Sequence, residues 1–231
     1  MPNIQGQAAN EQTLAAIYVD GFNLYHAIRD LGQSHLKWVN LWQLGQIIIP
    51  QQSQRLVGAV LCTAVPVGRS DKGQRHHWFI DAQRAYGVEV VRGHFIGEPL
   101  ECRACRETRV KDTEKEGDIN VALHIMRDAV LDKADHFYLL SADSDQAATV
   151  RMFRTMFPAK VITAVVPPGR EPSTHLAQTV NGGTIQLSEL HLERSVMPQV
   201  VLVEGHTAVR RPHQYTPPEG WVHPDNRPAR R

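Results

Sequence analysis

The sequence is poor in cysteine, in net charge and in long apolar runs, and each shortage excludes a class of protein. Its 231 residues contain three cysteines, too few for a disulfide framework, which indicates a reducing compartment. The net charge is +1, so a nucleic-acid site has to be a local patch and not a general basic field. No run of 18 apolar residues occurs, and the polar N-terminus lacks the pattern of a signal peptide. We therefore expect a cytoplasmic protein without a membrane span.

What the sequence does contain is an alternation of short apolar runs and amphipathic segments. Buried strands are predicted at residues 14–20, 55–65, 88–94, 136–140 and 161–166, with a short one near 184–187. Helices are predicted between them at residues 22–31, 40–49, 71–86, 118–131 and 145–157, with a short one near 173–180. This pattern favours an α/β fold in which a mainly parallel sheet of about five strands is covered by helices on both faces.

The same pattern divides the chain into regions. Residues 1–13 are polar and are expected to be flexible. Residues 14–190 form the expected folded domain, and residues 97–116 are expected to form a polar, cysteine-containing hairpin insertion within it. Residues 191–231 hold six of the fourteen prolines, so we expect an extended or poorly ordered C-terminal tail there.

Acidic residues follow two of the predicted strands directly. Asp20 ends the first strand, and Asp143 and Asp145 come within five residues of the strand 136–140. In open α/β sheets ligands bind beyond the carboxyl ends of the strands, so these acids are expected at one edge. Asp118 begins the helix that leads into the strand 136–140 and starts an inward-facing stripe of that helix. The four carboxylates should therefore converge.

Carboxylates gathered at one edge repel each other unless a cation or protons neutralise them. Oxygen ligands of this kind suit Mg²⁺ or Mn²⁺ better than zinc, and a metal-bound water can attack a phosphodiester. Each acid also has a structural interpretation. Asp20 could cap the helix that follows it, as could Asp143 or Asp145, and Asp118 could simply complement a helix dipole. The acids alone leave both interpretations open.

Three segments that contain these acids resemble the motifs of one family when they are taken together and in order. Residues 19–25 (Val-Asp-Gly-Phe-Asn-Leu-Tyr) resemble the opening motif of the NYN domain, the LabA-like branch of the PIN-like nuclease superfamily. Residues 114–122 (Glu-Lys-Glu-Gly-Asp-Ile-Asn-Val-Ala) look like its second motif, and residues 140–145 (Leu-Ser-Ala-Asp-Ser-Asp) look like its third. Residues 167–170 (Pro-Pro-Gly-Arg) resemble the run that follows the last core strand. The resemblance covers roughly residues 14–200.

The resemblance implies a PIN-like three-layer α/β sandwich and a Mg²⁺- or Mn²⁺-dependent endoribonuclease that hydrolyses RNA. The catalytic residues that it implies are Asp20, Asn23, Asp118, Asp143 and Asp145, and the implied metal ligands are Asp20, Asp118 and Asp143. Ser141 matches a small hydroxyl residue beside the metal, and Ala142 stands where the family usually has glycine. The alternative is a catalytically silent module on the same fold, which binds RNA or a protein and cuts nothing.

Two cysteines in the polar insertion have the spacing of half a zinc site. Cys102 and Cys105 would need two more ligands for a tetrahedral structural zinc. Those ligands could come from a homodimer that contributes the same pair twice, or from the nearby histidines His94, His76 and His77. The alternative is a free thiol pair on a surface hairpin.

Cations gather around the start of the predicted helix 71–86, on the same sheet edge as Asp20. Cations at a helix N-terminus are unfavourable without a partner, so we expect RNA phosphates to contact them. The candidate substrate-binding residues are Arg69, Lys72 and Arg75, joined by Lys115 from the second motif and by Ser141 beside the acids. Trp78 is available either for base stacking or for core packing.

Overall fold

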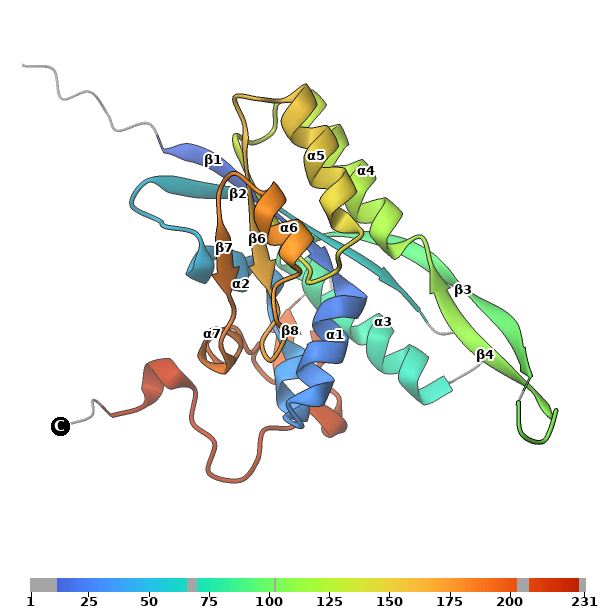
Figure 1. Ribbon diagram of the computed structural model, residues 1–231. Coiled ribbons are helices and arrows are strands. Elements are labelled where there is room, and N and C mark those ends of the chain that lie inside the picture. The colour runs from blue at the N-terminus through green and yellow to red at the C-terminus, as the bar shows by residue number, and fades with distance from the viewer. Residues whose placement is uncertain (1–11, 66–69, 102, 203–207, 229–231) are drawn as a thin grey trace, which may run out of the picture.

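The computed structural model describes residues 12–65, 70–101, 103–202 and 208–228, and it confirms the alternation of strands and helices (Figure 1). The main strands are β1 (Thr13–Asp20), β2 (Gln54–Ala64), β3 (Glu89–Glu101), β4 (Thr108–Lys115), β5 (His136–Leu140), β6 (Val161–Val166) and β7 (Thr184–Gln186). The helices are α1 (Gly21–Asp30), α2 (Leu41–Ile48), α3 (Ser70–Ala85), α4 (Gly117–Val130), α5 (Gln146–Met156), α6 (Thr174–Thr179) and α7 (Glu189–Glu193). None of the helices described is long and apolar enough to cross a membrane.

The seven strands form one sheet with the order β4-β3-β2-β1-β5-β6-β7. Neighbouring strands are parallel throughout, except for the antiparallel pair β3 and β4. The strand β1 lies in the middle, where Val19 is opposite Leu61 of β2 and Leu140 of β5. The carboxyl ends of these three strands therefore lie at one edge of the sheet, next to the residues that follow Asp20 and Leu140.

Apolar clusters on both faces of the sheet complete a three-layer sandwich. Side chains alternate between the faces along β1, so Ile17 and Val19 pack with α1 and α2, whereas Ala16 and Tyr18 pack with α4, α5 and α6. The helices α4 and α5 lie side by side over their face (Figure 1). By the same alternation, Asp20 belongs to the face that α4 covers.

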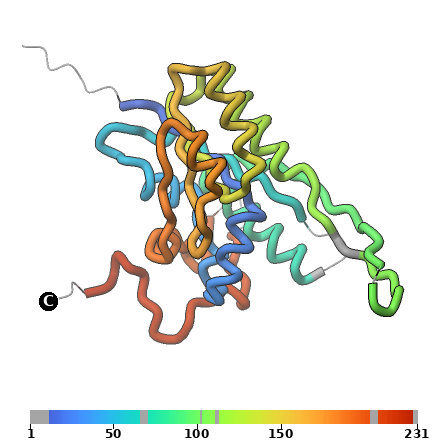
Figure 2. The backbone as a smooth tube through the Cα atoms, viewed as in Figure 1, coloured from blue at the N-terminus to red at the C-terminus, as the bar shows by residue number. Residues whose placement is uncertain are grey.

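The sheet has seven strands and not the predicted five or so. The strand β3 continues beyond the expected end at His94 and pairs with β4 to form a two-stranded ribbon that projects from the domain (Figures 1 and 2). The strand β4 has the sequence Thr-Arg-Val-Lys-Asp-Thr-Glu-Lys, which has no apolar run, so its pairing was not visible in the hydrophobicity pattern. Backbone hydrogen bonds to β3 define this strand. The short strand β7, which the sequence predicted near residues 184–187, accounts for the seventh.

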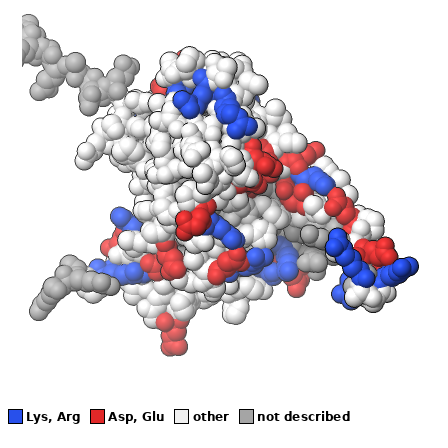
Figure 3. Space-filling view, viewed as in Figure 1, with Lys and Arg blue, Asp and Glu red and all other residues white. Residues whose placement is uncertain are grey.

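The outer end of this ribbon carries the polar insertion that contains the cysteines. Cys105 is exposed there and forms no disulfide with any described cysteine. Cys102 lies outside the described residues, so the zinc site with Cys102 and Cys105 stays a prediction. Blue atoms of Lys and Arg gather around the tip (Figure 3), where the sequence places Arg103, Arg106 and Arg109.

The C-terminal segment differs from the extended or poorly ordered tail expected after residue 190. Beyond α7 it forms the antiparallel pair β8 (Val200–Leu202) and β9 (Ala208–Arg210), and then the short turns η2 (His213–Tyr215) and η3 (Pro224–Asn226). Its apolar side chains Val201 and Val209 are buried with Trp38 and Met197. A few spaced apolar residues attach the segment to the domain. The domain boundaries themselves stay predictions.

Candidate active site

A cleft at the carboxyl edge of the sheet is lined by acids from all three motifs. Asp20 comes from the end of β1, Asp118 from the first turn of α4, Asp143 from the loop after β5, and Glu114 from β4. The empty volume of about 910 Å³, open mouth included, is sufficient for a nucleotide-sized ligand. Figure 3 shows red atoms where the N-terminal ends of α4 and α5 meet the base of the β3–β4 ribbon. The expected convergence of Asp20, Asp118 and Asp143 is therefore present.

Asp20 is the most enclosed of these acids, with 6% of its surface exposed. Its Oδ1 accepts a hydrogen bond from the backbone N–H of Asn23 at 2.9 Å, and its Oδ2 accepts one from the hydroxyl of Ser141 at 3.0 Å. Asp20 therefore caps α1 and lines the cleft at the same time. Burial raises the pKa of Asp20 to about 6, and the nearby Asp118 carboxylate adds to this rise, while the hydrogen bonds from Asn23 and Ser141 oppose it.

Hydrogen bonds fasten the loop after β5 onto the end of β1. The side-chain Oδ1 of Asn23 accepts from the backbone N–H of Ala142 at 3.1 Å. The fully buried Ser141 donates to Asp20 and accepts from the N–H of Asp143 at 3.1 Å. The first and third motifs thus form one unit, and the backbone of Asn23 contacts the acid while its side chain holds the loop.

Asp118 reaches the cleft because the chain turns sharply between β4 and α4. Glu116 takes a left-handed conformation with φ of 74°, and the helix starts at Gly117. Gln146 donates to the carbonyl oxygen of Asp118 at 3.2 Å, which ties the first turn of α4 to α5. Burial raises the pKa of Asp118, and Asp143 is the strongest of the neighbouring charges that add to it. Repulsion between neighbouring carboxylates therefore raises their pKa values across the cleft.

Glu114 and Glu171 are acids of the cleft that the sequence reasoning missed, and Glu114 lies closer to the predicted ligands in the second motif. The Oε1 of Glu114 is buried and has no hydrogen-bond partner within the described structure. Burial raises the pKa of Glu114, and the Asp118 carboxylate raises it further. A Cβ at Gly117 would lie 2.6 Å from that Oε1, so the glycine leaves the space that this carboxylate fills. The available signal was the position of Glu114 in the second motif, four residues before Asp118.

Several predicted site residues do not line the cleft. Asp145 is exposed at the start of α5, where its N–H donates to Asp143 Oδ1 at 2.9 Å, and it does not line the cleft. Lys115 pairs with Glu98 at 2.8 Å on the opposite side of β4 from Glu114. The cations that were expected to bind substrate, Lys72 and Arg75, lie on α3 beside a second pocket, and Arg69 lies outside the described residues.

Three further residues of the cleft add a cation and rings to this acidic surface. Arg170, from the run after β6, lines the cleft and pairs with Asp30 at the end of α1. Phe22 and His26 come from the side of α1 that faces the acids, and Phe22 packs against Phe95 of β3. Burial lowers the pKa of His26, with Arg29 adding to the effect. The wall of the cleft that α1 contributes is therefore partly aromatic.

The donor atoms of the cleft fit a hard divalent cation. Every acid offers oxygen, and the buried Oε1 of Glu114 without a partner and the raised pKa of Asp20 are unfavourable features that a cation would offset. Within the described residues, no three acidic, histidine or cysteine side chains already form a group that could hold a metal ion. Asp20, Asp118 and Asp143 therefore stay the predicted ligands of Mg²⁺ or Mn²⁺.

The parallel sheet and its acidic edge define a protein of the PIN-like α/β class. The sequence model of the NYN domain matches residues 14–182, well over half of the chain. The chain therefore belongs to the NYN domain family, a PIN-like nuclease family. Two of the three motifs that carry the resemblance, the first and the third, are joined by the hydrogen bonds of Asn23 and Ser141.

Two individual proteins resemble the chain more distantly. A protein of Pseudomonas putida, named 6-hydroxy-3-succinoylpyridine 3-monooxygenase HspA, is 23% identical over 86% of this chain and 74% of its own length. The crystal structure of VPA0982 from Vibrio parahaemolyticus, a protein of unknown function, covers 79% of this chain and 97% of its own chain with a TM-score of 0.51 at 20% identity. The latter supports the fold alone.

Proposed function

We propose that this protein is a Mg²⁺- or Mn²⁺-dependent endoribonuclease that hydrolyses RNA phosphodiester bonds. The observation that carries the proposal is the hydrogen bond from Ser141 to Asp20, which joins two acidic motifs 121 residues apart at one cleft. Membership of a family of PIN-like nucleases supports the same reaction. The name of the Pseudomonas relative describes a different chemistry, and 23% identity is too low to carry an activity over.

In this proposal Asp20, Asp118 and Asp143 would hold the cation, which would supply positive charge for the phosphate and lower the pKa of a water. Asp20 is fixed in orientation because both of its oxygens accept hydrogen bonds from the protein. Hydrolysis forms a bond from the water oxygen to phosphorus and breaks the bond to the 3′ oxygen, which leaves a 3′-hydroxyl and a 5′-phosphate. The raised pKa of Glu114 suits a group that accepts a proton of that water. Asp145 holds Asp143 through its backbone N–H.

The decisive variant is Asp143→Asn, which keeps the shape of the side chain and removes its charge. We expect the rate of cleavage of a fluorescent RNA with Mn²⁺ to fall at least a hundredfold, while the melting temperature stays close to that of the parent. Asp81→Asn, on the exposed side of α3, is the matched control and should cut at the parent rate. Full cleavage by purified Asp143→Asn would overturn the proposal.

The alternative is a silent module that binds RNA or a protein through the same cleft. The presence of every acid of the family motifs argues against it. It would prevail if Mn²⁺ gave no thermal stabilisation and the parent protein cut no RNA under any condition.

A further inference from the structure

A second pocket lies on the other side of α1 and takes no part in the proposed metal chemistry. Phe22, Asn23 and His26 of α1 face the acidic cleft, whereas Leu24 and Tyr25 line the second pocket. Its other walls come from η1 (Ser34–Trp38), from α3 and from η2 of the C-terminal segment. We call it the Tyr25 pocket.

The Tyr25 pocket lies close to Asp20, because residues that follow the ends of the Asp20 pairing on β1 and β2 form part of its wall. Gly21, in its wall, directly follows Asp20. Thr63, also in its wall, follows Cys62, the residue that is paired with Asp20 across β1 and β2. A molecule bound here would therefore lie next to one bound in the acidic cleft, with only the first turn of α1 between them.

The lining of the Tyr25 pocket is mostly apolar and rich in rings. Tyr25 and Tyr215 line it from opposite ends of the chain, and Phe79 stacks on His76 with ring centres 6.1 Å apart. Burial lowers the pKa of His76 to about 4, and its Nε2 lies 2.9 Å from the hydroxyl of Thr63, so this ring is neutral at pH 7. The empty volume of about 490 Å³, open mouth included, is sufficient for a small planar ring.

Cations surround this apolar space. Lys37 lines the pocket with its Nζ 5.1 Å from the centre of the Tyr25 ring, and it forms no ion pair with any described residue. Burial lowers the pKa of Lys37, and the neighbouring cations Arg29, Arg75 and Lys72 lower it further. Arg75 also forms a hydrogen bond with Tyr215. An anionic group at this mouth would relieve the repulsion among these cations.

We propose that the Tyr25 pocket binds one unpaired nucleobase of the RNA substrate, with a phosphate of the same strand at Lys37 and Arg75. This inference rests on the proposed function and specifies its substrate class, because a base can stack on aromatic side chains only when it is free of a duplex. The protein would then act on single-stranded RNA. The C-terminal segment would contribute to binding through Tyr215, which completes the pocket.

The test measures binding of a fluorescent single-stranded oligoribonucleotide and of its duplex in the Asp143→Asn background with Mn²⁺, where cleavage does not interfere. Tyr25→Leu and Lys37→Gln should each weaken binding of the single strand at least fivefold. Tyr25→Phe keeps the ring and should bind like the parent. Lys133→Gln removes a lysine beside Asp128 on the far side of the domain and is the matched control. Tyr25 is 40% exposed, so its variants should fold, and melting curves will verify this.

Equal binding by all variants, or tighter binding of the duplex than of the single strand, would overturn the inference. Binding of benzoate at this pocket without any effect of Tyr25→Leu on RNA would assign it to free aromatic acids and would also overturn it. Cleavage assays with the Asp143-containing protein separate the two proposals. If RNA is cut and Tyr25→Leu cuts and binds normally, the nuclease stands and the pocket fails. If no RNA is cut but binding depends on Tyr25, the pocket stands and the nuclease fails.

Discussion

The side-chain oxygen of Asn23 accepts a hydrogen bond from the backbone N–H of Ala142, and the two residues are 119 positions apart in the chain. The amide therefore fixes the loop that carries Asp143 against the helix that starts after Asp20. A family motif that looks like a set of separate acids is, in three dimensions, one hydrogen-bonded junction. This junction, together with the pairing of β1 and β5, positions Asp143 relative to Asp20.

Asn23→Ala should reduce RNA cleavage at least tenfold, because the loop with Asp143 loses its anchor. The free energy of unfolding should fall by about 1 kcal/mol, since one buried backbone N–H loses its acceptor. Asn181→Ala is the matched control: Asn181 accepts from the N–H of Ile162 at 2.8 Å, outside the acidic cleft. It should lose similar stability and keep full activity. Equal activity losses in the two variants would show that Asn23 acts only through stability.

The stability of the metal-free protein should depend on Asp20. Its pKa is raised by burial to about 6, above the ordinary value of 3.8, so the folded state binds the proton more tightly than the unfolded state. This group therefore contributes a penalty that is absent below pH 4 and grows to roughly 3 kcal/mol as the pH rises through 6. Mn²⁺ should raise the melting temperature more at pH 7.5 than at pH 5.

Asp20→Asn provides the control for that experiment. The amide cannot ionise, so the variant should lose most of the dependence of its melting temperature on pH between 4 and 7. Its stabilisation by Mn²⁺ should also decrease strongly. A variant that keeps both behaviours would show that other carboxylates, such as Glu114 and Asp118, dominate the cleft.

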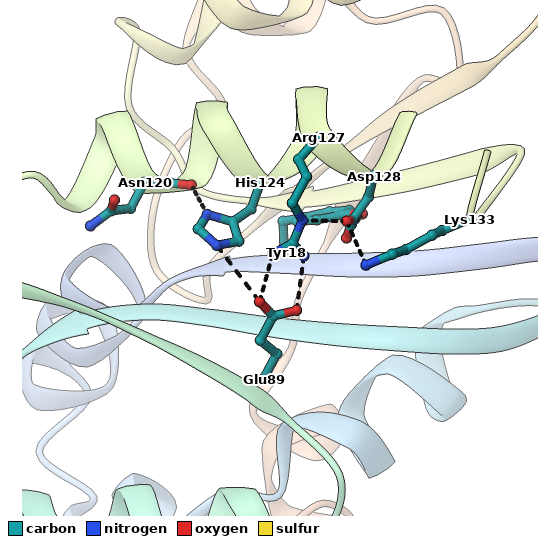
Figure 4. Close-up of polar contacts among 7 residues, drawn as sticks. All are labelled: Tyr18, Glu89, Asn120, His124, Arg127, Asp128 and Lys133. Carbon is teal, nitrogen blue, oxygen red and sulfur yellow. Dashed lines mark hydrogen bonds and ion pairs between the residues drawn. The ribbon is translucent and has the colours of Figure 1, made fainter. Parts of the chain in front are cut away.

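A polar network beneath α4 should make a large contribution to stability (Figure 4). Arg127 binds both oxygens of Glu89 at 2.7 and 2.8 Å, and the hydroxyl of the buried Tyr18 donates to Asp128 Oδ2 at 3.0 Å. Burial alone would raise the pKa of Asp128, but hydrogen bonds from Arg127, Lys133 and Tyr18 hold it below its usual value. The network thus attaches α4, which carries Asp118, to β1 and to the start of β3.

Asp128→Ala should lower the free energy of unfolding by about 3 kcal/mol, because it leaves the Tyr18 hydroxyl buried without an acceptor and Arg127 without one partner. Tyr18→Phe should cost only about 1 kcal/mol, since Asp128 keeps both cations. Urea titrations of the two variants test this order. Equal losses would mean that the hydroxyl, and not the carboxylate, is the main contributor.

The sequence by itself determined the order of the elements and the identity of three acids in the cleft. Apolar runs and helical periodicity located the core strands to within a few residues, because β1, β2, β5 and β6 are buried on both faces and must be apolar. The motif spacing then placed Asp20, Asp118 and Asp143 at one sheet edge. Parallel strands connected by helices have their carboxyl ends on the same side, so the expectation required no knowledge of contacts.

Tertiary structure alone decided the features that depend on pairing between distant segments. A hairpin was expected at residues 97–116, but the backbone hydrogen bonds that define the ribbon of β3 and β4 leave no hydrophobic pattern. The sequence therefore did not reveal that β4 extends the sheet or that its Glu114 lines the cleft. Asp145 follows a strand just as Asp143 does, yet it is exposed at the N-terminus of α5 and does not line the cleft. The composition of the C-terminal segment is typical of a tail, but its Tyr215 lines the Tyr25 pocket beside α1. Packing of the segment against Trp38 brings it back to the N-terminal part of the domain.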